Sequence, residues 1–296
     1  MVPTKLLIAV AADTDVQSIA DDLRRAGLRS DVHATVLSVA DLLPIPAGAE
    51  RAALPAAARR ARERTARGLE EAQRVAADAA GVLRAAFPSW VIDAEAQADA
   101  PAWAIVKRAD HWHPDLIVLC AHERSALQRI ALGSVSQSVL THASGSVRIV
   151  RRSHAEPAGP PSLVIGIDGS PAAEAVAAAV AERAWPAGST ALLLSVFDPT
   201  LANMLGFTDD SGDECDAAAR LASRAAAALG TAGLAVSSLV IEGNPKQVLV
   251  EQAEARGASC LVVGARGLRA VDRLLLGSVS ASVAAHAHCT VEVVRR

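Results

Sequence analysis

The 296-residue sequence has few aromatic residues: it contains three Phe, four Trp and no Tyr. A platform for single-stranded nucleic acid needs aromatic rings on which bases stack, so this kind of binding is disfavoured. The formal net charge of −3 provides no basic field for a phosphate backbone. No apolar run approaches the roughly 18 charge-free residues of a membrane-spanning helix. We therefore expect neither a nucleic-acid partner nor a membrane partner.

Paired cysteines and common catalytic motifs are also absent. The four cysteines occur without a CxxC pair, which argues against a disulfide framework or a zinc site. Their scatter fits a reducing compartment, so we expect a cytoplasmic protein. The chain has no GxxxxGK(S/T) phosphate loop, no GxGxxG dinucleotide loop and no GxSxG nucleophile turn. The usual catalytic machinery is therefore missing, and the sequence supports at most a weak enzymatic activity.

The chain contains an internal repeat. The segments LIVLC, LGSVS and VRIVRR of residues 116–152 return as LVVG, LGSVS and VEVVRR in residues 261–296. The spacing is constant, and it places Gly133 and Gly277 at equivalent positions. We predict two copies of one domain, at residues 1–152 and 162–296. The linker 153–161 between them is rich in Pro and Gly, which prevent regular structure.

Each copy alternates apolar runs of strand length with Ala-rich helical stretches, which is typical of βαβ units and a parallel sheet. The expected strands of the first copy are 5–11, 32–39, 91–96, 116–119 and 147–150, with a long helix at 54–87. Those of the second copy are 163–167, 191–196, 236–241, 260–263 and 291–294, with helices at 171–185, 213–231, 245–256 and 278–286. Successive apolar residues indicate that helices cover both sheet faces. We predict two tandem three-layer α/β/α domains, each with a five-stranded parallel, doubly wound, Rossmann-like sheet.

A glycine-rich loop follows the fourth predicted strand of the second copy. Gly264 and Gly267 are separated by two residues, and after nine more residues Gly277-Ser278 opens the last helix. Glycines let the backbone approach a ligand, and a helix N-terminus presents free N–H groups, so this pattern suits a phosphate chain. Ligands of such sheets bind where the strand order reverses. Asp168, after the first strand of this copy, faces the same crevice if strands one and four are neighbours.

Simpler roles for these residues stay open. The glycines could serve turn geometry alone, Ser278 and Ser134 could be helix N-caps, and Asp168 could cap the helix that follows it. His286, with His288 and Cys289 beside it, suggests a metal site, but a histidine at a helix end also suits the helix dipole, and we expect no metal there.

The spacing G-2x-G-9x-G-(S/T) resembles the universal stress protein family in its tandem two-domain form, over nearly the whole chain. The resemblance implies ATP as the ligand and leaves open whether Mg²⁺ or Mn²⁺ accompanies it. It implies that the last strands of the two copies pair as an intramolecular pseudo-dimer, that chains form homodimers, and that residues 197–212 are a mobile flap. The implied ATP-binding residues, from adenine and nucleoside to phosphates, are Val196, Asp168, Gly264, Gly267, Gly277, Ser278, Val279 and Ser280.

The first copy departs from this pattern. Cys120 and Glu123 replace the first two glycines. A carboxylate beside a polyphosphate costs on the order of a few kcal/mol at an effective dielectric constant near about 20, so we expect this site to be weak or empty. A different ligand, or attraction of Glu123 to Arg124, stays open. The site residues that remain in this copy are Asp13, Val39, Gly133 and Ser134.

Three functions are consistent with the sequence. The first is an ATP-binding regulatory protein of the stress response, in which the second copy holds the nucleotide. The second is a slow ATP hydrolase, because a bound triphosphate with Mg²⁺ needs only a positioned water, although no general base is apparent. The third is a nucleotide-free interaction module acting through pairing of strands 147–150 and 291–294 at the sheet edges. The intact loop of the second copy favours the first function.

Overall fold

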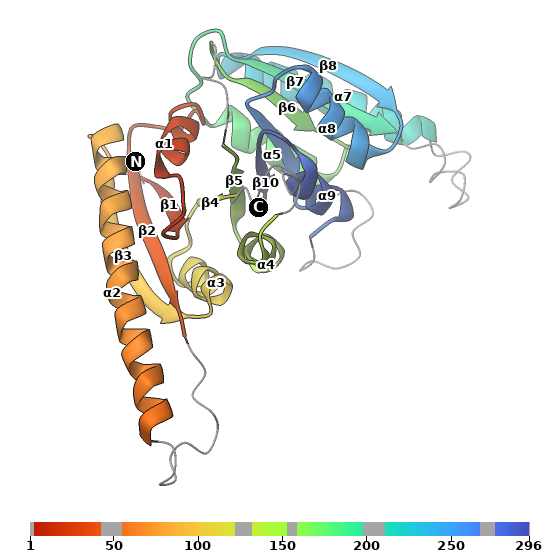
Figure 1. Ribbon diagram of the computed structural model, residues 1–296. Coiled ribbons are helices and arrows are strands. Elements are labelled where there is room, and N and C mark those ends of the chain that lie inside the picture. Colours follow the sequence, from red (N-terminus) through yellow and green to blue (C-terminus); the bar gives the residue numbers. More distant parts are fainter. Residues whose placement is uncertain are drawn as a thin grey trace.

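The computed structural model describes residues 3–42, 55–121, 132–152, 159–197, 211–266 and 276–295. Figure 1 shows two α/β halves joined through their sheets. The N-terminal half contains β1 (Thr4–Val10), α1 (Val16–Arg24), β2 (Val32–Asp41), α2 (Pro55–Ala86), β3 (Val91–Asp99), α3 (Pro101–Trp112), β4 (Leu116–Cys120), α4 (Ser134–His142) and β5 (Ser146–Val150). The C-terminal half contains β6 (Ser162–Gly166), α5 (Pro171–Ala181), β7 (Thr190–Phe197), α7 (Ser211–Thr231), β8 (Ala235–Glu242), α8 (Pro245–Ala255), β9 (Cys260–Gly264), α9 (Ser278–His286) and β10 (Thr290–Val294).

The strands form one continuous ten-stranded sheet in the order β3-β2-β1-β4-β5-β10-β9-β6-β7-β8. Neighbours within each half are parallel, which confirms the predicted five-stranded doubly wound arrangement. The halves meet where β5 pairs antiparallel with β10, with Arg148 opposite Glu292. The predicted intramolecular pairing of the last strands is therefore confirmed. Strands one and four are neighbours in both halves, as the site prediction requires.

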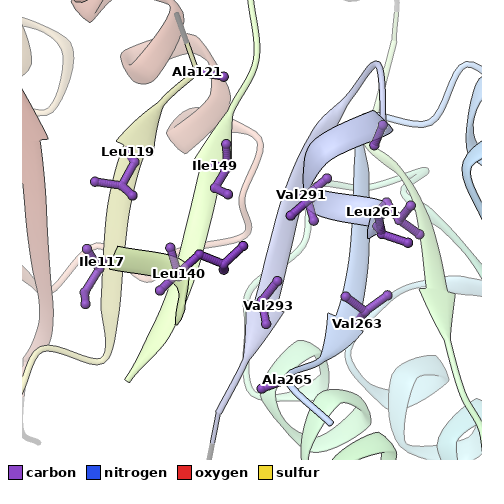
Figure 2. Packing of buried hydrophobic residues seen from close by; sticks show 14 of the residues in the cluster. Ile117, Leu119, Ala121, Leu140, Ile149, Leu261, Val263, Ala265, Val291 and Val293 are labelled. Carbon is purple, nitrogen blue, oxygen red and sulfur yellow. The ribbon is translucent and has the colours of Figure 1, made fainter. Parts of the chain in front are cut away.

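The two faces of the sheet are packed differently at this junction. On the face covered by α3, α4, α8 and α9, one apolar cluster continues across both halves, and it includes Ile149 of β5 with Val291 and Val293 of β10 (Figure 2). On the opposite face, α1 with α2 and α5 with α7 cover two separate clusters. Side chains alternate along a strand, so Arg148 and Glu292 point to this second face. The junction is thus apolar on one face and charged on the other.

The largest difference from the expected boundaries is in α5, which ends at Ala181 instead of continuing to Trp185. The Trp185 indole N–H donates to Val180 O at 2.8 Å, and the Ala184 N–H donates to Gly27 O of the other half at 2.8 Å. Gly27 has φ +65°, and a Cβ there would lie 2.9 Å from the Trp185 ring. Contact between the halves therefore ends the helix earlier than its own Ala-rich pattern suggests.

The edge strands are less covered than the sequence pattern indicates. Val91 of β3 is 60% exposed and Val240 of β8 is 57% exposed. Each of these strands has a single neighbour and lies at an end of the sheet. The expectation that helices cover both faces holds for the central strands and is wrong for these edges. None of the helices in the described ranges combines the length and the apolar character that a bilayer crossing requires.

Candidate functional site

The carboxyl ends of β6, β7 and β9 meet at one edge of the C-terminal half. Ile165 of β6 is in register with Val262 of β9, and Gly166 is in register with Leu194 of β7. Asp168 is the second residue after β6, Val196 lies near the end of β7, and Gly264 ends β9. The strand order reverses between β6 and β9, where ligands of doubly wound sheets bind. The structure therefore brings these three predicted site residues to one edge.

Gly264 lies where β9 closely approaches the first turn of α5. A Cβ at this position would be 3.0 Å from Ala172 Cβ and 3.2 Å from Arg266 O, which is tighter than ordinary van der Waals contact. The absence of a side chain lets the N-terminus of α5 approach the end of β9. The positive end of that helix dipole consequently lies at the predicted phosphate loop.

A second helix N-terminus, that of α9, lies beside the same loop. The Gly277 N–H donates to Ala265 O at 2.8 Å and so closes the loop. Gly277 itself is the N-cap of α9, with no side-chain hydrogen bond to the first turn, and Ser278 is the exposed first helical residue. The alternative that Ser278 is the N-cap is therefore wrong. Within the described residues, no side-chain cap is present at the first turn of α9, so its N–H groups can serve an anion.

Ser280 is part of the support for this edge. Its hydroxyl donates to Gly264 O at 2.6 Å, and the side chain is buried. The bond ties the first turn of α9 to the end of β9, which fixes the helix N-terminus next to the loop. The contribution of the Val279 and Ser280 backbone to a phosphate contact stays a prediction.

Asp168 belongs to a tight turn ahead of α5. Its Oδ1 accepts the Ser170 N–H at 3.0 Å, and Ser170 Oγ accepts the Ala173 N–H at 3.2 Å. Ser170 is thus the N-cap of α5, and the alternative that Asp168 caps this helix is wrong. Gly169 has φ +79°, a left-handed conformation that allows the chain to turn between the two residues. The turn places the Asp168 carboxylate at the strand edge, outside the helix.

The remaining predicted residues of this copy are less defined. Val196 pairs with Ile241 of β8 and is partly buried against the shared core. Gly267 and residues 198–210 of the expected flap lie outside the described residues. Residues 211 and 212, the end of that expected flap, form the first turn of α7 instead.

The N-terminal copy repeats the topology, with fewer contacts at Gly133 among the described residues. Asp13 follows β1, Val39 lies in β2, and Gly133 and Ser134 are the N-cap and first residue of α4. Nothing among the described residues lies within 4 Å of a Cβ placed on Gly133. Within the same residues, no hydrogen bond joins Gly133 to Ala121 in the way that Gly277 is joined to Ala265. Glu123 and Arg124 lie outside the described residues, so the predicted repulsion stays a prediction.

The surroundings of the cysteine thiols and of His286 fit a structural role. Burial raises the pKa of the Cys120 thiol to about 11, that of Cys260 to about 12 and that of Cys289 to about 11. These thiols stay protonated near neutral pH, which argues against thiolate redox chemistry. His286 Nδ1 donates to Ser282 O at 2.7 Å at the end of α9. No group of three or more metal-ligating side chains gathers within the described part of the chain.

The ten-stranded sheet with two related halves defines a tandem doubly wound α/β protein. The universal stress protein family model matches residues 4–151 and 161–295. A universal stress protein of Mycobacterium tuberculosis strain H37Rv is 32% identical over 186 residues, and the alignment spans 62% of either chain. One from Mycolicibacterium smegmatis is 30% identical over 229 residues, or 77% of this chain and 75% of that one.

A solved universal stress protein from Archaeoglobus fulgidus shares the fold, with a TM-score of 0.67 at 19% identity over 99% of this chain and 96% of that one. The chain spans less than two thirds of the length of the mycobacterial relatives that it matches at 32% identity. The family match, in contrast, covers both copies. This chain belongs to the universal stress protein family.

Proposed function

We propose that this protein is an ATP-binding regulator of the stress response that holds one nucleotide in its C-terminal copy. The observation that carries the proposal is the N-terminus of α9, which has a glycine N-cap and no side-chain cap among the described residues, and which the Gly277–Ala265 and Ser280–Gly264 hydrogen bonds hold beside the end of β9. The N-terminus of α5 lies at the same edge, so two helix dipoles favour negative charge there. Nucleotide occupancy would change the conformation of this edge and thereby its affinity for a partner.

The proposed site orients ATP along the edge of the sheet. The backbone of Val196 meets adenine at the end of β7, and Asp168 accepts hydrogen bonds from the nucleoside. The triphosphate lies over the N-termini of α5 and α9. The residues assigned to its phosphates are Gly264, Gly267, Gly277, Ser278, Val279 and Ser280.

The site belongs to a domain that we place at residues 162–296, after the linker 153–161 and the N-terminal domain 1–152. In the N-terminal domain, Cys120 replaces Gly264 and Glu123 replaces Gly267, so its site is weaker. The proposal includes a cytoplasmic location and association of chains as homodimers. The structural support for this proposal comes only from the described residues, which exclude 43–54, 122–131, 153–158, 198–210 and 267–275.

The test is a matched pair of substitutions, Ser278→Glu and Ser134→Glu. Both residues are the first residue of a helix behind a glycine N-cap, where a carboxylate is tolerated by the helix dipole. A carboxylate at 278 repels phosphates, whereas the same change at 134 affects only the weak site. Nucleotide released by denaturation would be quantified by ion-exchange chromatography, and ATP binding would be measured by calorimetry.

We expect about one ATP per wild-type chain, lost in Ser278→Glu and retained in Ser134→Glu. Loss in Ser134→Glu alone would move the site to the N-terminal copy. A wild-type protein that neither carries nor binds ATP would refute the proposal and favour the interaction module. Release of ADP with Mg²⁺ or Mn²⁺ present, under conditions in which ATP alone is stable, would favour the slow hydrolase.

A further inference from the structure

A pocket lies between the two halves. Its volume is about 800 Å³, and its lining combines α1 and the end of β5 with the end of α8 and the amino ends of β6, β9 and β10. The predicted nucleotide edge of the C-terminal copy lies at the opposite, carboxyl ends of β6 and β9. None of the predicted nucleotide-binding residues that the structure describes lines this pocket. It is therefore a separate candidate for a ligand.

The lining of the pocket is basic in a chain of net negative charge. Five arginines and three carboxylates line it. Two of those carboxylates are already matched: Asp22 pairs with Arg148 at 2.6 Å, and Asp21 pairs with Arg24 outside the pocket. The third, Glu254, lies on the exposed rim, 3.9 Å from His288. The arginines that line the pocket are Arg25, Arg148, Arg151, Arg152 and Arg256.

The base of the pocket is a neutralised ion-pair network. The Arg148 side chain is 3% exposed and pairs with both Asp22 and Glu292, the latter at 2.8 Å. Glu292 also accepts from Arg183, and Asp22 accepts from the Thr290 hydroxyl at 2.7 Å. Because positive and negative groups alternate, this network contributes little surplus charge to the pocket.

The positive charge that no described carboxylate neutralises comes from other arginines of the lining. Arg25 donates to Gly159 O at 2.8 Å and to Ser259 Oγ at 2.9 Å, and both acceptors are neutral. Neither Arg25 nor Arg256 has a carboxylate within ion-pair distance in the described part of the chain. Ser259 Oγ accepts from Arg25 and from the Ser162 N–H at 3.1 Å. The Ser259 hydroxyl hydrogen is consequently left to donate to a ligand.

The helix C-termini near the pocket have carbonyl groups that accept hydrogen bonds, so their partial negative charge repels an anion only weakly. The C-terminal carbonyls of α8 accept the Gly257 N–H at 3.0 Å and the Ala258 N–H at 2.9 Å. The last carbonyls of α9, those of Ala284 and Ala285, accept from Arg151 at 2.6 and 3.1 Å. These bonds satisfy carbonyl groups that would otherwise present partial negative charge.

We propose that this pocket binds a small oxyanion of two or more negative charges, carried by phosphate or carboxylate groups. Arg25 and Arg256 supply the charge, and the Ser259 hydroxyl supplies a neutral hydrogen bond. Arg25 comes from the N-terminal half, whereas Ser259 and Arg256 come from the C-terminal half, so the anion bridges the junction. Binding there is independent of ATP at the edge of the C-terminal copy.

The test is calorimetry of the full chain with two probes, inorganic pyrophosphate and citrate, at one fixed ionic strength. Arg25→Gln should weaken binding about tenfold, the scale of a lost hydrogen bond to a charged group. Arg256→Gln should weaken it about threefold, as for an exposed ion pair. Glu254→Gln removes a rim carboxylate and should strengthen binding about twofold. The matched control is Arg224→Gln, which makes the same charge change on α7 away from the pocket.

The pattern across these variants decides the outcome. Binding of pyrophosphate alone identifies a phosphate ligand, and binding of citrate alone identifies a carboxylate ligand. The proposal is overturned if neither probe binds, or if Arg224→Gln weakens binding as much as Arg25→Gln does. It is also overturned if Ser278→Glu abolishes pyrophosphate binding while the pocket variants leave it unchanged, because the anion would then lie at the N-terminus of α9. A chain that binds pyrophosphate but not ATP, with binding weakened by Arg25→Gln and unaffected by Ser278→Glu, would support the pocket and refute the nucleotide site.

Discussion

The two copies share a sheet, but their described residues hold the start of the last helix differently. In the C-terminal copy, Gly277 is hydrogen-bonded to Ala265 and Ser280 to Gly264, so the start of α9 is fixed against the end of β9. In the N-terminal copy, the described residues around Gly133 leave open space at the equivalent position. The junction strands of both copies, in contrast, are fully packed. Among the described residues, the junction strands are thus packed alike in the two copies, whereas the contacts that hold the start of the last helix differ.

The largest expected effect comes from the junction, where Arg148 and Glu292 occupy equivalent positions of the two copies. Glu292→Gln removes the charge that pairs with Arg148 and Arg183 in a buried site. We expect the free energy of unfolding to fall by about 3 kcal/mol, measured by urea denaturation. The matched control Glu174→Gln breaks an exposed pair with Arg224 and should cost less than about 1 kcal/mol. Equal losses in the two variants would contradict the structural role of the buried pair.

Acid provides a second way to weaken the junction. Burial alone would raise the pKa of Glu292, but Arg183 and Arg148 outweigh it and hold the pKa below its ordinary value. A lowered folded-state pKa means that the stabilisation is present above the unfolded-state pKa, declines as the pH falls below it, and is lost below the folded-state pKa. Denaturation curves across the acid range should show a smaller pH dependence for Glu292→Gln than for wild type. Parallel curves would exclude this carboxylate as a source of acid sensitivity.

A smaller loss of stability should distinguish Gly277 of the C-terminal copy from Gly133 of the N-terminal copy. In Gly277→Ala the new Cβ would lie 3.1 Å from Ala265 O, so the loop must shift. We expect a loss of about 1 kcal/mol in stability and several-fold weaker ATP binding. Gly133→Ala has backbone angles that alanine adopts, and no described residue lies within 4 Å of the new Cβ, so its stability should change by less than about 1 kcal/mol. Thermal unfolding and calorimetry would check both variants, and equal effects would remove the distinction between the loops.

The smallest effect is expected at Cys120, which occupies the position of Gly264 in the N-terminal copy. Its raised pKa of about 11 leaves very little thiolate at neutral pH. Alkylation of native protein by iodoacetamide, followed by peptide mass mapping, should leave this residue largely unmodified. Alkylation should become complete after unfolding. Rapid modification of the native chain would contradict the burial of this thiol.

Much of the fold follows from the sequence because its apolar runs are regular and the chain is repeated. The strands begin and end within a few residues of their expected positions, and Asp168, Val196 and Gly264 meet at the edge that the strand order dictates. The hydrogen bond from Ser280 to Gly264 was not predictable, because it depends on how closely α9 approaches β9. The early end of α5 was not predictable either, because it depends on Gly27 of the other half.

One signal in the sequence did point to the buried ion pair. The repeat aligns Arg148 with Glu292, and equivalent positions on two strands related by a local two-fold axis face each other. A pair of opposite charges at such positions therefore indicates a contact between the copies. The additional partners Asp22 and Arg183 lie on α1 and just after α5, so only the folded structure reveals the complete network.

The antiparallel pairing of β5 with β10 has a consequence for recognition. Since the strands of one half run opposite to those of the other, the carboxyl ends of β1 and β4 and those of β6 and β9 emerge on opposite rims of the molecule. A molecule bound at one rim therefore contacts the strand ends of one copy and lies across the sheet from those of the other. A substitution at one rim can consequently leave the opposite rim unchanged.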